Sequence, residues 1–134
     1  MSNQTESSFW RQIKTGLSST DVVCTRIENS STQGIPDLLL LDRQSQFHLI
    51  ELKVAKGNKV LLSPHQVSFA TRHKGARSWI VVKKDDTVYL YRADQAIEVF
   101  EDGLRVAAHG TFTKPVNWTD FLTTIETHRV PLEP

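Results

Sequence analysis

Carboxylate side chains lie beside or within two of the most apolar segments of the chain. Asp37 immediately precedes four consecutive leucines, and Glu51 lies within the alternating segment 47–54. Because side chains alternate between the two faces of a strand, Glu51 shares a face with Lys53, about 7 Å away along the strand. A hairpin centred on Gln44 places Asp37 directly opposite Glu51, with the two Cβ atoms roughly 5 Å apart. The spacing predicts two facing carboxylates next to a lysine.

Such a pair of carboxylates has a limited set of chemical uses. Two unneutralised carboxylates repel each other, and burying them is costly. A divalent cation removes this cost, and oxygen ligands suit Mg²⁺ or Mn²⁺. Two alternatives stay open: Lys53 offsets one charge in a buried ion-pair network without metal, or a register slip of one residue turns Asp37 to the opposite face. The residue types favour a metal site.

The apolar pattern predicts the elements that position this pair. Residues 36–41 read as a strand buried on both faces because of the leucine run, and residues 47–54 as an alternating strand. The other expected strands cover residues 21–28, 78–84 and 87–91, and the other expected helices cover residues 5–17, residues 94–100 and a segment from Asn117. The main elements follow the order α-β-β-β-α-β-β-α, which predicts an α/β sheet with helices packed on it.

A helix between the third and fourth of these strands has clear ends in the sequence. Ser63 is a good N-cap, and Pro64 suits the first helical position. Gly75 stands where a C′ glycine ends a helix. These signals place Gln66 in the first turn. Residues 105–134 carry little further signal except an amphipathic last helix, which either caps the core or builds a dimer.

Composition bounds the class of protein. The chain has 134 residues, of which 39% are hydrophobic and 23% charged, and these values exclude a disordered chain, a collagen and a coiled coil. No stretch approaches 18 consecutive apolar residues and the first residues lack an apolar signal region, so we expect neither a membrane partner nor secretion. The single cysteine, Cys24, fits a reducing cytoplasm and is expected to be a small buried residue on a strand.

Basic residues are concentrated in one part of the chain, although the formal net charge is only +1. The segment from Leu52 to Lys84 contains no acidic residue and holds eight of the sixteen lysines and arginines. Such a block is typical of a surface that binds a polyanion. The alternative is an ordinary solvated basic face.

The histidines do not form a recognisable metal motif. They stand at positions 48, 65, 73, 109 and 128 without an H-E-x-x-H pattern, and Cys24 is alone, which argues against zinc. His48 faces away from Glu51 and is expected to be packed or at the rim. His65 and His73 are candidates for phosphate contact, and the three tryptophans are expected in the core.

Several motifs together resemble the PD-(D/E)xK nuclease superfamily and, within it, the VRR-NUC family. Gly34-Ile35-Pro36-Asp37 is followed after thirteen residues by Glu51-Leu52-Lys53, and Gln66 follows Lys53 after twelve more. Arg26-Ile27-Glu28-Asn29 and Gly75-Ala76 also resemble that family. The resemblance covers residues 5–92. It implies a restriction-endonuclease-like core with a central mixed sheet flanked by helices, a single nuclease domain over residues 1–134, and a C-terminal extension over residues 93–134.

The resemblance implies a role for each matching residue. Asp37 and Glu51 would bind the metal ion, Mg²⁺ or Mn²⁺, together with the backbone carbonyl of Leu52. Lys53 would hold or polarise the attacking water and stabilise charge on the phosphate. Gln66 would orient that lysine, a metal-bound water or the phosphate.

The resemblance also implies a further acidic residue from the first helix, for which Glu6 is the candidate. The alternative for Glu6 is a helix cap, because Asn3-x-x-Glu6 matches a capping box. Glu28 is a rival for the same role, and it could equally be an exposed strand end.

These residue types suit phosphodiester hydrolysis, in which a water must become nucleophilic and the phosphate gains charge. The resemblance implies a metal-dependent endodeoxyribonuclease that leaves a 5′-phosphate and a 3′-hydroxyl, acting on branched DNA, especially four-way junctions, as a homodimer. The residues expected to hold DNA phosphates are Lys56, Lys59, Arg72, Lys74 and Arg77. The first helix and the exposed sheet edge are the candidate dimer surfaces.

Two other functions stay open from the sequence. A nuclease with the same chemistry could act on flap, nicked or linear DNA, because substrate choice depends on surface shape. A non-catalytic DNA-binding module could keep the fold, although such a module has no reason to retain the set Asp37, Glu51, Lys53 and Gln66.

Overall fold

The computed structural model describes residues 5–27 and 34–128. Its centre is a six-stranded sheet in which the strands are ordered as in the sequence, β1 to β6. Among the described strands, β3 and β4 pair in parallel and the other neighbours are antiparallel. The strands are β1 (Val23–Arg26), β2 (Leu38–Leu41), β3 (Phe47–Val54), β4 (Ser78–Lys84), β5 (Thr87–Arg92) and β6 (Gly110–Thr113).

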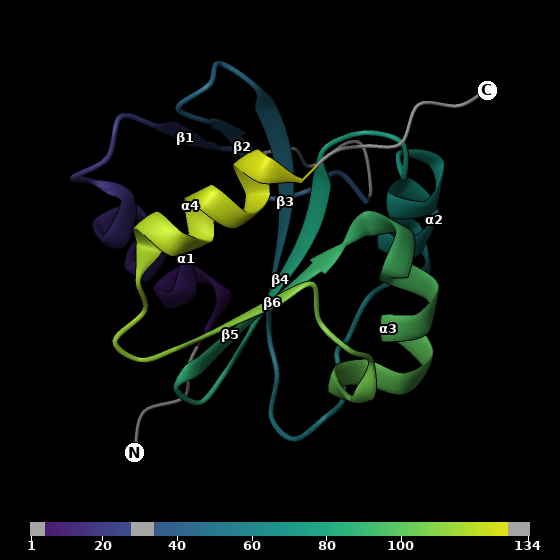
Figure 1. The fold of residues 1–134 in the computed structure, drawn as a ribbon. Coiled ribbons are helices and arrows are strands. Elements are labelled where there is room, and N and C mark those ends of the chain that lie inside the picture. The colour runs from purple at the N-terminus through teal and green to yellow at the C-terminus, as the bar shows by residue number, and fades with distance from the viewer. Residues whose placement is uncertain (1–4, 28–33, 129–134) are drawn as a thin grey trace.

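Helices cover both faces of the sheet (Figure 1). The α-helices are α1 (Glu6–Leu17), α2 (Pro64–Arg72), α3 (Ala96–Asp102) and α4 (Trp118–Thr127), and the short 3₁₀ turns are η1 (Ala93–Gln95) and η2 (Gly103–Arg105). No helix in the described ranges is long and apolar enough to cross a membrane. The predicted α/β class with a central mixed sheet is confirmed.

Two apolar clusters fix the layers. The larger one joins α1 and α4 to one face of the sheet, and the even-numbered residues of β3, Ile50 and Leu52, point into it. The smaller cluster joins α2 and α3 to the opposite face, where Ile80 and Val82 of β4 meet Ala70 of α2. Because Glu51 alternates with Ile50 and Leu52, its side chain emerges on the α2 side.

The β2–β3 hairpin has the register that places the two carboxylates opposite each other. Leu38 pairs with Ile50, Leu39 with Leu49, Leu40 with His48 and Leu41 with Phe47. The prediction of a hairpin centred on Gln44 is therefore confirmed. β2 is covered less completely than expected, because Leu38 and Leu40 are fully buried whereas Leu39 and Leu41 are only partly buried.

Side-chain caps begin the helices that flank the site. Thr5 caps α1 in a reciprocal box with Ser8, and Ser63 caps α2 in the same way with Gln66. Asn3 lies outside the described residues, and Glu6 is the first residue inside α1. The alternative that Glu6 caps the helix is therefore wrong, because Ser8 closes the capping box.

Two predicted boundaries differ from the structure. α2 ends at Arg72 with His73 as its C-cap, so Gly75 does not terminate the helix. The reason is local: the His73 ring stacks on Phe69, and its Nδ1 lies 2.7 Å from the Phe69 carbonyl oxygen. β1 is shorter than expected, covering four residues, and Cys24 on it is half-buried. Burial raises the pKa of the Cys24 thiol to about 11.

The C-terminal part of the chain completes the core. Strand β6, which the predicted order omits, pairs antiparallel with β5. Phe121, Leu122 and Ile125 of α4 are buried in the larger cluster. Arg43 forms a salt bridge with Glu126 at 2.6 Å, which ties α4 to the β2–β3 turn. Of the two roles left open for this segment, the structure supports capping the core.

Candidate active site

The carboxylate of Asp37 completes the pairing of β3 where β2 begins. Its Oδ2 accepts a hydrogen bond of 2.8 Å from the backbone N–H of Leu52. On the other side, its backbone carbonyl accepts from Ile27 N–H at 2.7 Å. Asp37 is thus held by its neighbours on both sides, and its side chain has one orientation relative to β3.

Glu51 is buried beside Asp37. Its side chain is only 6% exposed. Burial raises the pKa of Glu51 to about 9, with further contributions from the negative charge of Asp37 and a hydrogen bond to its carboxyl group, against a lowering effect of Lys53. At neutral pH the Glu51 carboxyl group therefore keeps its proton, which avoids burying a second negative charge beside Asp37.

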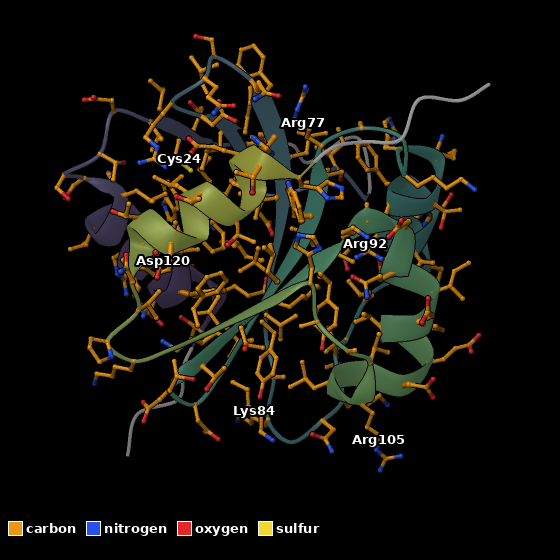
Figure 2. All side chains as sticks on the ribbon, viewed as in Figure 1. Cys24, Arg77, Lys84, Arg92, Arg105 and Asp120 are labelled. Atoms are coloured by element: carbon orange, nitrogen blue, oxygen red, sulfur yellow. The ribbon has the colours of Figure 1, made fainter. Side chains whose placement is uncertain are left out.

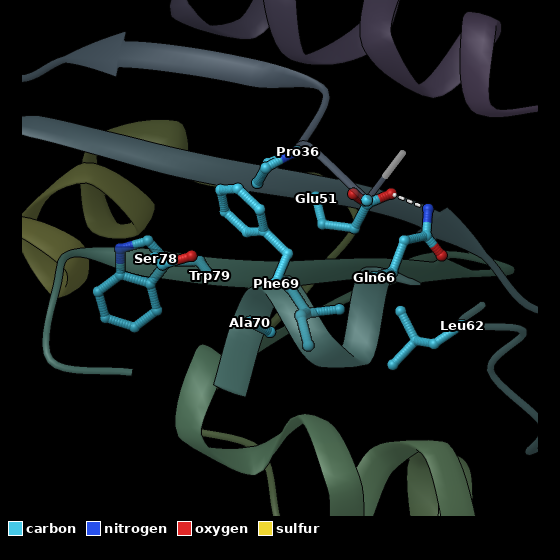
Figure 3. Close-up of a pocket in the computed structure, with 10 residues that line it drawn as sticks. Pro36, Glu51, Leu62, Gln66, Phe69, Ala70, Ser78 and Trp79 are labelled. Atoms are coloured by element: carbon cyan, nitrogen blue, oxygen red, sulfur yellow. Dashed lines mark hydrogen bonds between the residues drawn. The ribbon is translucent and has the colours of Figure 1, made fainter. Parts of the chain in front are cut away.

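Gln66 holds the other side of Glu51 (Figure 3). Its Nε2 donates to Glu51 Oε2 at 3.0 Å, while its Oε1 accepts from the backbone N–H of Ser63 at 2.9 Å. The capping box therefore fixes the orientation of the amide, because its oxygen is used at the helix N-terminus and only its NH₂ group can face Glu51.

Gly34 allows the start of α2 to approach the Asp37 turn. Its φ is +89°, which favours glycine, and a Cβ at this position would collide with the backbone carbonyl of His65. The glycine ahead of Asp37 and the glutamine of α2 thus belong to one packed unit.

Two further charged residues, Lys53 on β3 and Glu6 at the start of α1, lie near the carboxyl groups of Asp37 and Glu51. Lys53 lies on the same face of β3 as Glu51 and is half-buried. Partial burial of the Glu6 carboxyl group raises its pKa; the positive charge of Lys53 lowers it, and the negative charge of Asp37 raises it. Glu6 is therefore within electrostatic reach of the predicted catalytic set. Glu28 lies outside the described residues.

The oxygen donors at this site fit a hard divalent cation. Within residues 5–27 and 34–128, no three His, Cys, Asp or Glu side chains form a group that could hold a metal ion. In a strand, the N–H and C=O of one residue point to the same neighbouring strand. The Leu52 carbonyl therefore points to the side on which its N–H meets Asp37. Two carboxylates and one carbonyl match the preference of Mg²⁺ or Mn²⁺.

The basic residues lie on two sides of the carboxylate pair. Lys56 and Lys59 are exposed in the segment that follows β3. Arg72 and Lys74 lie at the far end of α2, whose nine residues span about 13 Å. Figure 2 shows Arg77 near the start of β4, at the opposite end of that strand from Lys84.

Lys83 differs from the other members of the basic segment. It is 7% exposed, and its Nζ donates to Gln12 Oε1 at 2.5 Å. Burial lowers the pKa of Lys83. Lys83 therefore does not contribute to the polyanion-binding surface expected for the segment from Leu52 to Lys84.

His48 belongs to a buried network that the sequence analysis did not identify. Its Nε2 lies 2.8 Å from Asp42 Oδ2, and the indole N–H of Trp79 donates to its Nδ1 at 3.0 Å. Asp42 Oδ1 also accepts from the backbone N–H groups of Gln44 and Gln46, which shapes the hairpin turn. The only sequence signal for this role is an aspartate placed just before the turn.

The chain is similar to a known protein family and to solved structures. A family model described as archaeal Holliday junction resolvase (Hjc) matches residues 1–130. The chain is similar to a solved VRR_NUC domain, with 20% identity, a TM-score of 0.47, and coverage of 72% of this chain and 94% of that one. It is also similar to the structure of Archaeoglobus fulgidus Hjc, a Holliday junction resolvase, with 16% identity, a TM-score of 0.50, and coverage of 84% and 89%. Comparison with curated proteins gives no significant match.

The mixed sheet is similar in fold to the solved Hjc structure, and Asp37, Glu51 and Lys53 lie at its β2–β3 hairpin. The chain belongs to the archaeal Holliday junction resolvase (Hjc) family, because the family model covers nearly its whole length. It is a Holliday junction resolvase-like nuclease. The resemblance predicted from the motifs is confirmed.

Proposed function

We propose that the protein is a metal-dependent endodeoxyribonuclease that cuts branched DNA, in particular four-way junctions, as a homodimer. The observation that carries the proposal is the buried Glu51 carboxyl, facing Asp37 on one side and the fixed Gln66 amide on the other. A buried acid with a strongly raised pKa and a specific charged neighbour is typical of a functional site.

The proposed metal ligands are Asp37, Glu51 and the backbone carbonyl of Leu52, and the ion is Mg²⁺ or Mn²⁺. When bound, the ion would increase the acidity of the attacking water and offset the charge that develops on the phosphate. Glu51 would have to lose its proton to hold the cation, so we expect ion binding to release a proton.

The remaining side chains have proposed roles that follow from their positions. The Lys53 ammonium group shares the β3 face with Glu51, so it can donate a hydrogen bond to the attacking water or to a phosphate oxygen. Gln66 keeps the Glu51 carboxylate in one orientation through its amide N–H. Glu6 lies close enough to influence the charge on these groups without being a direct ligand.

The proposed DNA surface combines the two groups of basic residues. Lys56 and Lys59 lie on one side of the catalytic set, and Arg72, Lys74 and Arg77 lie toward the other end of α2. Contacts to the phosphate backbone from both sides would hold a strand across Glu51 without reading its sequence. This distribution of basic residues supports selection of DNA by its shape and not by its base sequence.

The homodimer is proposed from the symmetry of the substrate. Symmetric cutting of a four-way junction needs two active sites related by a two-fold axis, which a C2 dimer supplies. The surfaces proposed for the contact are α1 and the sheet edge formed by β1, a four-residue strand that pairs only with β2 among the described strands.

A cleavage assay tests the proposal. A labelled four-way junction and a matched linear duplex are incubated with the wild type and with Lys53→Ala, with EDTA, Mg²⁺ or Mn²⁺. We expect paired symmetric nicks with 5′-phosphate ends on the junction, only with the ion, and none with the variant. Equal cutting of both substrates would overturn the preference for branched DNA. Tight binding without any cutting would overturn the catalytic proposal.

A further inference from the structure

Leu61 projects into solvent from the segment that joins β3 to α2. Its side chain is 70% exposed, whereas its neighbours Val60 and Leu62 are 3% and 6% exposed. Both neighbours belong to the apolar cluster beneath α2 and α3. Leu61 is therefore held outward between two buried anchors.

The same segment is fixed to the body of the protein at a second point. The carbonyl oxygen of Asn58 accepts from the backbone N–H of Leu104 at 2.7 Å. Gly103, whose φ is +61°, packs so closely on Asn58 that a Cβ there would collide with its carbonyl oxygen. A side chain between two such attachments keeps its direction, so the exposure of Leu61 is a built feature of this loop.

The surroundings of Leu61 connect it with the site. It lines one groove together with Lys56 and Lys59 from its own segment, Val54 from the end of β3, and Thr5 and Glu6 from the start of α1. Val54 directly follows Lys53 on β3, which places the groove next to the catalytic set. The apolar side chain of Leu61 therefore lies in one groove with Lys56 and Lys59, beside the proposed point of cleavage.

We propose that Leu61 contacts the faces of bases that are unstacked at the branch point of the DNA substrate, and so contributes to selection of branched DNA. The inference rests on the proposed function. In a continuous duplex the base faces are covered by stacking. Lysines beside the groove that bind the phosphates would then place Leu61 against the polar backbone, where it has no apolar surface to contact. At a branch point the stacking is interrupted, so an apolar side chain can cover a base face at lower cost.

The test compares Leu61→Ser with Leu61→Met, which keeps an apolar side chain of similar size. Phe47→Ser is the matched control, because Phe47 is also exposed, at 59%, but belongs to the β2–β3 hairpin outside the groove. The first readout is the fluorescence of 2-aminopurine placed at the branch point of a junction, measured with each protein in EDTA. The second is the ratio of junction to duplex affinity in the same buffer.

We expect the wild type, Leu61→Met and Phe47→Ser to change the 2-aminopurine signal and to prefer the junction. Leu61→Ser should lose the signal and lower the affinity ratio by about tenfold, the scale of burying one leucine side chain. A ratio and signal that Leu61→Ser leaves intact, or that Phe47→Ser lowers equally, would overturn the inference. Because both readouts are made without cutting, they stay decisive even if the cleavage assay refutes the nuclease proposal.

Discussion

The backbone N–H of Leu52 donates to Asp37 Oδ2 at 2.8 Å, at the point where the β2–β3 pairing ends. The Asp37 side chain continues the ladder of hydrogen bonds that the β2 backbone no longer provides. The same carboxyl group faces Glu51. Asp37 therefore has both a structural and a proposed chemical role. A substitution that tests the chemical role has to preserve the hydrogen bond from Leu52.

Asp37→Asn meets this condition, because the amide oxygen can still accept from Leu52. We expect the variant to fold and bind junction DNA as the wild type does, with cleavage reduced at least about 100-fold by loss of a metal-binding charge. Gel-shift titration and single-turnover cleavage measure the two quantities. Weaker DNA binding in parallel with weaker cleavage would instead assign Asp37 to substrate binding.

The raised pKa of Glu51 predicts how the stability of the metal-free protein depends on pH. The folded protein keeps the Glu51 proton to about pH 9, whereas an unperturbed glutamate loses it near 4.5. The folded state therefore binds more protons in this range, and the free energy of unfolding falls as the pH rises from about 4.5 to 9.

Thermal or urea unfolding in EDTA at several pH values measures this effect. The difference between the wild type and Glu51→Gln isolates it, since the other titrating groups are common to both proteins. We expect the variant to become the more stable of the two as the pH rises, and Mg²⁺ to stabilise only the wild type. A difference that does not change with pH would contradict the buried, protonated state of Glu51.

Gln66 closes the capping box of α2 and also donates a hydrogen bond to Glu51. One substitution at Gln66 and one control substitution in α1 separate these two roles. Glutamate also closes a capping box, so Gln66→Glu should keep the helix start while removing the N–H donor to Glu51. We expect cleavage to fall about 10- to 100-fold, as measured by single-turnover rates.

Ser8→Ala provides the control, because Ser8 occupies the equivalent position in the α1 capping box. This variant removes the hydrogen bond from the Thr5 backbone N–H and should lose about 0.5–1.5 kcal/mol of stability, while its cleavage rate per folded molecule stays near that of the wild type. A similar loss of cleavage in both variants would mean that Gln66 acts only through the helix.

Trp79 stabilises the hairpin through His48. Its indole N–H donates to His48 Nδ1, which leaves the His48 Nε2–H for Asp42. Trp79→Phe removes the donor and leaves a buried nitrogen unpaired, so we expect a loss of about 1–3 kcal/mol beyond the change in packing. Urea unfolding compares it with Trp118→Phe, which changes the same side chain at a half-buried position. Equal losses would show that the hydrogen bond contributes nothing of its own.

Much of the fold was predictable because its signals are local. The apolar run of β4 and the alternation of β3 gave the bounds of both strands, and Ser63 and Pro64 marked the start of α2. The facing of Asp37 and Glu51 followed from strand alternation and one assumption about the turn. The contact between Gln66 and Glu51 was beyond such arguments, because it depends on how α2 packs on the sheet.

The features that were missed depend on tertiary contacts. Strand β6 has only four residues, including a glycine and two threonines, and its Phe112 gains a partner in Phe121 of α4. Lys83 looks like any other basic residue in the sequence, yet the fold turns it toward Gln12 and the ring of Phe9. No local pattern distinguishes a lysine that will be buried in this way from one that will meet solvent.

Salt dependence tests which lysines meet DNA. Lys56 and Lys59 are exposed beside the catalytic set, so replacing either with alanine should weaken binding to junction and duplex alike and reduce the slope of log K against log salt by about 1. Lys114→Ala is the control, because Lys114 is exposed next to β6 and its backbone N–H is bonded to Asp86. Binding titrations between low and physiological salt give the slopes. An unchanged slope for Lys56→Ala and Lys59→Ala, or an equal reduction for Lys114→Ala, would place the DNA on another face of the protein.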